Sequence, residues 1–75
     1  MIHLCEVTVP GLRVADVPAL RRVLLRGFPE VRGVVETTRP GTVQVVYDGP
    51  ERLSAWCAEI TRAGWGYPQG GMAAA

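Results

Sequence analysis

The side chains in this 75-residue chain best suited to soft-metal or redox chemistry are those of His3, Cys5 and Cys57. Thiolate and imidazole groups are the ligands that Cu(I) and Zn(II) prefer in proteins. Neither cysteine has a close cysteine or histidine partner at a recognised metal-binding spacing. We therefore interpret the two thiols first as small buried hydrophobic groups. A displaced metal-binding or redox pair is the alternative, with His3 as a further candidate ligand.

The remaining polar residues offer no arrangement for catalysis. The chain has one histidine, close to its first residue, so neither a Ser–His–Asp nor a Cys–His arrangement can be assembled from the sequence. Paired carboxylates and glycine-rich phosphate loops of recognised spacing are also missing from it. The sequence predicts a protein that is not an enzyme.

Charge and hydropathy exclude further classes. The formal net charge is +1, and all eight basic residues are arginines, so no strong overall field attracts nucleic acid. No apolar run approaches the roughly 20 residues of a membrane span. The first residues, 1–5, lack the basic region of a secretory signal. We expect a cytoplasmic protein, without membrane or nucleic-acid partners, whose thiols stay reduced.

Alternating and helical patterns indicate the elements that must position these side chains. Residues 3–9 alternate, with Cys5, Val7 and Val9 on one face, which predicts a strand. Residues 11–15 are expected to form a loop, and Asp16 to cap the helix that follows. The apolar stripe of that helix consists of Val17, Leu20, Leu24 and Phe28.

The second half of the chain predicts a hairpin and another helix. Strands are expected at 31–38 and 42–47, with Val43, Val45 and Tyr47 on one face of the latter. A helix opening near residue 48 ends at Gly64. Its apolar stripe consists of Leu53, Trp56, Cys57, Ile60 and Ala63.

A short edge strand at 65–69 completes the order β-α-β-β-α-β, and residues 70–75 are expected to be a flexible tail. This order is typical of a ferredoxin-like α+β fold, an antiparallel sheet with two helices on one face. The predicted domain covers residues 1–69.

The RNA-recognition module shares this order of elements, but it needs exposed aromatic side chains on the first and third strands. The only aromatic residue in the corresponding strands of this chain is Tyr47, which is expected on the same face as the buried valines.

Four short segments occur in the order and spacing of one family of small metal-binding domains. They are Val7-Thr8-Val9-Pro10-Gly11-Leu12, Phe28-Pro29-Glu30-Val31, Tyr47-Asp48-Gly49-Pro50 and Ile60-Thr61-Arg62-Ala63-Gly64-Trp65. Over about residues 4–67 the chain resembles the heavy-metal-associated domain of copper chaperones, mercury carriers and metal-pump amino termini. The resemblance implies a ferredoxin-like fold and a Gly-Met-x-Cys-x-x-Cys metal loop after the first strand.

The loop of this chain departs from the family pattern at both ligand positions. The stretch reads Gly11-Leu12-Arg13-Val14-Ala15-Asp16-Val17, so Val14 and Val17 stand where the family has cysteines. Valine has no lone pair to donate, and soft cations require thiolate. The sequence therefore predicts that the family's metal site is lost and that no cofactor is bound there.

Two functions follow as hypotheses. The first is a small binding module, similar to the heavy-metal-associated domain, that acts in protein–protein interaction, as a monomer or weak homodimer, with a partner that has an acidic surface. Its expected contact residues are Arg13, Val14, Val17, Arg21, Arg22 and Arg26. The second is a divergent carrier that binds copper or zinc through Cys5, Cys57 or His3, singly or across a dimer.

Overall fold

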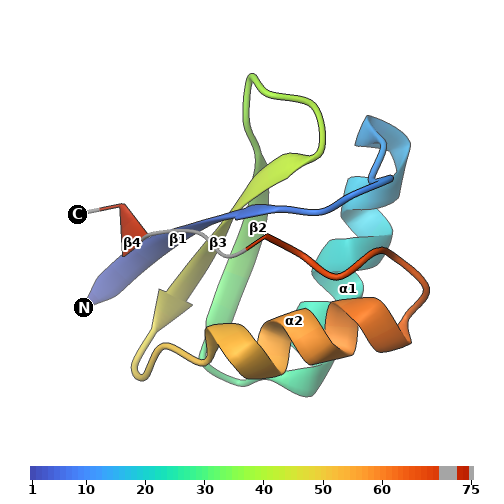
Figure 1. Cartoon of the computed structure of the whole chain (residues 1–75). Helices are drawn as coiled ribbons and strands as arrows, with labels where there is room; N and C mark the ends of the chain where they lie inside the picture. The colour runs from blue at the N-terminus through green and yellow to red at the C-terminus, as the bar shows by residue number, and fades with distance from the viewer. Residues whose placement is uncertain (70–72, 75) are drawn as a thin grey trace.

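The computed structural model describes residues 1–69 and 73–74 of the chain, which form a small α+β structure (Figure 1). The structure contains three long strands, two α-helices, one short 3-10 turn and one two-residue strand. In order they are β1 (Ile2–Thr8), η1 (Val14–Asp16), α1 (Val17–Gly27), β2 (Val31–Glu36), β3 (Thr42–Asp48), α2 (Leu53–Arg62) and β4 (Ala73–Ala74).

The strands form one antiparallel sheet in the order β2-β3-β1-β4. The longest pairing joins β1 to β3, from Ile2 opposite Asp48 to Thr8 opposite Thr42. On the other side of β1, the two residues of β4 pair with Leu4 and Cys5. Because β1 lies between β3 and β4, the first strand is an inner strand of the sheet.

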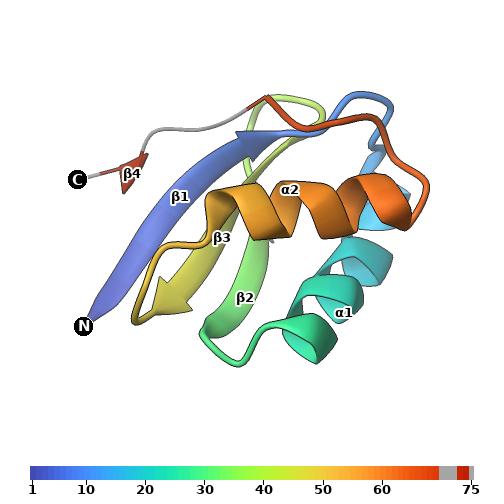
Figure 2. The same cartoon turned by 60° about the horizontal axis from the view of Figure 1, so that its bottom comes forward.

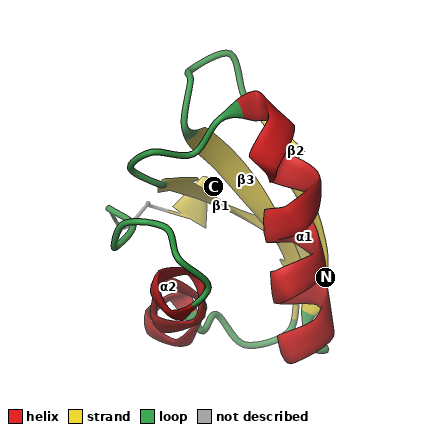
Figure 3. Cartoon of the chain, turned by 90° about the vertical axis from the view of Figure 1, so that its right-hand side faces the viewer, coloured by secondary structure: helices red, strands yellow, loops and turns green. Residues whose placement is uncertain are grey.

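One face of the sheet is covered and the other is open. The strand residues predicted to point inward are buried, which confirms the alternation read from the sequence; they are Cys5, Val7, Val9, Val43, Val45 and Tyr47. Leu20 and Leu24 of α1 join them in one core with Trp56 and Ile60 of α2. Both helices therefore lie on the same side of the sheet (Figure 2); in Figure 3 α1 runs along the sheet and α2 is seen end-on below the strands.

The turn before α1 differs from the predicted loop. Residues Val14–Asp16 form a 3-10 turn, and Asp16, although it precedes the first residue of α1, makes no capping hydrogen bond to that helix. Its Oδ2 accepts instead a hydrogen bond from the backbone N–H of Arg13, at 3.1 Å. The prediction of Asp16 as a side-chain cap of α1 is wrong, because the carboxylate closes the preceding turn.

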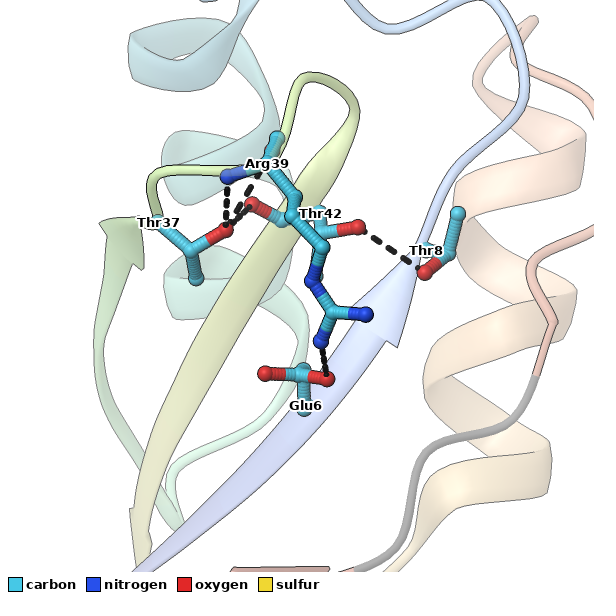
Figure 4. A network of polar contacts seen from close by, with 5 residues as sticks. All are labelled: Glu6, Thr8, Thr37, Arg39 and Thr42. Atoms are coloured by element: carbon cyan, nitrogen blue, oxygen red, sulfur yellow. Dashed lines mark hydrogen bonds and ion pairs between the residues drawn. The ribbon is translucent and has the colours of Figure 1, made fainter.

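The hairpin of β2 and β3 is shorter on its β2 side than predicted, since β2 ends at Glu36. The Thr37 hydroxyl donates to the carbonyl oxygen of Thr42 at 2.8 Å and accepts from the backbone N–H of Arg39 (Figure 4). The Thr42 hydroxyl in turn bonds that of Thr8, at 3.0 Å, and Arg39 pairs with Glu6. Side-chain hydrogen bonds thus replace the backbone pairing at this end of the hairpin, and they connect the hairpin to β1.

The segment 65–69 does not form the predicted edge strand. It makes a single bridge, in which the N–H groups of Thr8 and Gln69 each donate to the other residue's carbonyl, at 3.3 and 2.8 Å. The strand at this edge, β4, lies within the predicted tail, of which residues 70–72 and 75, including Gly70-Gly71, are outside the described residues. Pro68 has no N–H to donate to a ladder, which shortens the pairing here.

The second helix begins later than predicted and has a narrower apolar stripe. It starts at Leu53, after a turn in which Gly49 has a φ of 115° and the Glu51 carboxylate accepts the Leu53 N–H. Trp56, Cys57 and Ile60 are buried, as expected. Ala63 is exposed, because the helix ends at Arg62 and the chain turns away.

Candidate interaction surface

The two valines of the loop that resembles a metal-binding loop differ in their exposure to solvent. Val14, on the 3-10 turn, is 65% exposed, whereas Val17, the first residue of α1, is 3% exposed and belongs to the core. Val17 was expected among the partner contacts, and its burial removes it from the candidate surface. Val14 remains at the surface beside Arg13.

Asp16 holds Arg13 close to this turn. The Arg13 Nε lies 3.5 Å from Asp16 Oδ2, in addition to the backbone hydrogen bond. That backbone hydrogen bond, assisted by the guanidinium, lowers the pKa of the Asp16 carboxyl. Arg13 therefore stands at the surface with its charge already opposed by a neighbouring carboxylate.

Both thiols are buried. Cys5 and Cys57 are 1% and 3% exposed, and both are in the thiol form. Burial raises the pKa of Cys5, with smaller contributions from Glu51 and Cys57, and burial followed by Glu51 raises the pKa of Cys57. A high pKa disfavours the thiolate that metal binding and disulfide exchange both require.

His3 does not complete a metal site with them. Its ring packs against that of Tyr47, with centroids 5.3 Å apart. Within residues 1–69 and 73–74, no group of three or more His, Cys, Asp or Glu side chains is arranged to hold a metal ion. In the described residues, Cys5, Cys57 and His3 thus belong to no group of three or more side chains that could hold a metal ion.

Most arginines are held by groups of the chain itself. Arg21 donates from Nε to the Val34 carbonyl oxygen at 3.3 Å, which fixes it against β2. Five others pair with carboxylates, namely Arg13 with Asp16, Arg32 with Asp48, Arg39 with Glu6, Arg52 with Glu30 and Arg62 with Glu59. Among the described residues, Arg22 and Arg26 have neither a hydrogen-bond nor an ion-pair partner.

Arg22 and Arg26 form a ridge between two hollows on the surface. On one side, a groove of about 490 Å³ runs between α1 and α2. Its lining consists of Ala19, Arg22, Val23, Arg26, Gly27, Glu59 and Arg62. On the other side, a hollow of about 380 Å³ is bounded by Pro18, Arg21 and Leu25, the last 41% exposed. The two arginines line both hollows, so an anionic group could reach them from either side.

The sequence identified the α1 arginines but not the residues that face them from α2. Glu59 and Arg62 join the surface only because α2 packs beside α1, which no local pattern shows. The single available signal was their i, i+3 spacing on a predicted helix, which is typical of a surface ion pair.

The arginines and apolar side chains of this surface suit the binding of an anionic, partly apolar ligand. Guanidinium groups beside apolar side chains can form bidentate hydrogen bonds with carboxylates, while the apolar neighbours contact the carbon atoms of the ligand.

No family model matches the chain, and neither a curated protein nor a solved structure shows significant similarity to it. In the part of the chain that the structure describes, neither helix is long and apolar enough to cross a bilayer.

Proposed function

We propose that this chain is a small non-enzymatic binding module of ferredoxin-like fold, similar to heavy-metal-associated domains, that has lost their metal site and acts in protein–protein interaction. The order β1-α1-β2-β3-α2-β4, with both helices on one face of an antiparallel sheet, supports the fold. The partner surface is α1 with the turn before it, and the partner is acidic at the contact.

One observation is the main support for the proposed interaction. Arg22 and Arg26 are charged groups without a partner in the described structure, and they stand between two hollows with partly apolar lining. An arginine that served only solubility would not need to lie beside a partly apolar hollow. An arginine that meets a carboxylate in a partly desolvated groove gains a strong, directional contact.

The loss of the metal site rests on the chemistry of the loop. Val14 and Val17 offer only carbon and hydrogen where a soft cation needs sulfur. The inward position of Val17 gives this residue a packing role in place of a ligand role. The loop in this proposal is therefore a structural turn that presents Val14 and Arg13.

A second candidate function is a carrier that handles copper or zinc through Cys5, Cys57 or His3, singly or across a dimer. The proximity of the two thiols, which is close enough for Cys57 to influence the pKa of Cys5, favours it. Their burial opposes it, because binding would require the core to open and both thiols to ionise.

Affinity capture with the full chain, read out by quantitative mass spectrometry, tests the interaction. We expect one abundant partner to bind the wild-type chain and to be lost from Arg22→Gln/Arg26→Gln. The matched control is Arg32→Gln/Arg39→Gln, which removes the same charge from the β2–β3 hairpin and should retain the partner. Equal capture by both variants would show that α1 is not the binding surface.

Anaerobic titration with Cu(I) and Zn(II) against a competing chelator tests the alternative. Stoichiometric binding tighter than about 1 μM, lost in Cys5→Ser or Cys57→Ser, would replace the interaction module with the carrier. Binding that the serine variants leave unchanged would exclude the two thiols as the site.

A further inference from the structure

The groove between α1 and α2 has an apolar floor with one residue from each turn of α1. Ala19, Val23 and Gly27 are spaced four residues apart, so they lie along one side of the helix, one above the next. At a rise of about 1.5 Å per residue, this floor is roughly 12 Å long. Its small side chains leave room for a partner's side chain to pack against α1.

The charges along the groove do not balance. Its one carboxylate, Glu59, is held by Arg62, whose Nη2 lies 2.8 and 3.0 Å from the two carboxylate oxygens. This contact also raises the pKa of Arg62. Arg22 and Arg26 line the opposite wall and make no ion pair with Glu59 or with any other described acidic residue. Three arginines therefore face one glutamate.

We propose that this groove binds an acidic amphipathic helix of a partner protein, with carboxylates over Arg22 and Arg26 and an apolar side chain on the Ala19–Val23–Gly27 floor. This inference rests on the proposed function and specifies the chemistry of the partner. Residues four apart on a helix lie about 5–6 Å from each other, so acidic residues at i and i+4 match the spacing of the two arginines. A helix also presents its apolar side chains beside them, as in other helix-in-groove complexes.

The composition of the groove favours a peptide over a nucleic acid. Its lining contains no aromatic side chain among the described residues, so bases have no stacking surface there. With a net charge of +1 for the chain, no strong long-range field attracts a nucleic acid either.

Glu59 also sets the strength of binding. While it engages Arg62, only two arginines are available to the incoming helix. The substitution Glu59→Gln removes the competing charge and releases Arg62 to the groove. Binding of an acidic helix should therefore tighten several-fold, and the gain should disappear in Glu59→Gln/Arg62→Gln.

The test uses the full chain and two fluorescein-labelled synthetic peptides. One is a leucine-containing amphipathic helix with glutamates at i and i+4, and the other has glutamines at the same places. By fluorescence anisotropy, the acidic peptide should bind the wild type and weaken at least about tenfold in Arg22→Gln/Arg26→Gln, equivalent to about 1.4 kcal/mol. Arg32→Gln/Arg39→Gln should stay within about twofold, and the glutamine peptide should bind weakly.

Amide chemical-shift mapping of the same complex locates the contact. We expect perturbations at the groove residues of α1 and at Glu59 and Arg62. Failure of the acidic peptide to bind, equal effects of the two double variants, perturbations centred on Arg13 and Val14, or equal binding of a single-stranded oligonucleotide would each overturn the groove proposal. If the captured partner is nevertheless lost from Arg22→Gln/Arg26→Gln, the interaction module stands and only its occupant is wrong.

Discussion

Glu30 connects three parts of the molecule. Its side chain, in a residue only 8% exposed, accepts a hydrogen bond from Trp56 Nε1 at 3.0 Å, and Arg52 Nε of the turn before α2 lies 4.0 Å from the same carboxylate. Its carbonyl oxygen accepts the Asp48 N–H at 2.9 Å. Glu30 thus joins the start of β2 to the end of β3 and to α2, which explains a carboxylate at a position with so little contact with water.

Removal of this carboxylate should destabilise the fold. In Glu30→Ala, the buried indole N–H of Trp56 loses its acceptor, and an unsatisfied buried donor costs about 1–3 kcal/mol. Urea unfolding measures the loss. The control Glu36→Ala removes an exposed carboxylate at the end of β2 and should change the free energy of unfolding by less than about 0.5 kcal/mol.

A double-mutant cycle separates the hydrogen bond from the packing of Glu30. In a Trp56→Phe background no indole donor remains, so Glu30→Ala should cost less than in the wild type. If the cost is the same in both backgrounds, the bond to Trp56 does not stabilise the structure and Glu30 acts through its other contacts.

At the scale of the elements, α2 ends in a hydrogen-bonded Schellman motif. The N–H of Gly64 donates to the carbonyl of Thr61 at 3.1 Å, and that of Trp65 donates to Ile60 at 3.4 Å. Gly64 has a φ of 118°, which side chains with a Cβ rarely adopt. The partly buried Trp65 then packs on the core, so the glycine directs the chain from the helix back toward β1.

The substitution Gly64→Ala should therefore destabilise the protein by about 1–2 kcal/mol, through backbone strain alone. No atom lies within 4 Å of a Cβ placed there, so steric overlap does not contribute. Gly27→Ala is the matched control, since that site is equally open and has no positive φ. It should be neutral or stabilise by up to about 1 kcal/mol, because alanine favours the helix. Thermal and urea unfolding compare the two; equal losses would contradict the argument.

The elements that the sequence predicts well are those with a local period. Alternation placed Cys5 and Val45 in the core, and the stop signal at Gly64 set the end of the second helix. Errors arose where partners are distant in the chain. Whether segment 65–69 pairs with β1 depends on the path that the chain takes after α2 and not on its own residues.

The sequence also predicted the candidate surface only where its residues follow a local pattern. Arg22 and Arg26 follow from the helical spacing of α1, since they fall outside its apolar stripe. Val17 was assigned both to the apolar stripe of the helix and to the partner contacts; its burial confirms the first assignment and contradicts the second. Glu59 and Arg62 required the tertiary contact between α1 and α2.

At the scale of the whole molecule, the place of Val14 and Val17 in the fold allows the proposed relationship to metal carriers to be tested. Val14 and Val17 flank the junction of β1 and α1, and Val17 is the first residue of a helix whose N-terminal amides favour negative charge. A thiolate at this position would be stabilised for the same reason. Val14, on the 3-10 turn, is exposed and Val17, at the start of α1, is buried, so two sulfurs placed there approach one ion only if the side chain at position 17 turns outward.

If the chain descends from a soft-metal carrier, Val14→Cys/Val17→Cys should bind one Cu(I) ion per chain. The single variants Val14→Cys and Val17→Cys keep the native Cys5 and Cys57 and supply only one new sulfur, so they should bind at least about tenfold more weakly. Anaerobic competition with a Cu(I) chelator measures this, and circular dichroism confirms that each variant is folded. A folded double variant no better than the single ones would show that this turn cannot bring two sulfurs together, and the proposed relationship to metal carriers would lose its structural basis.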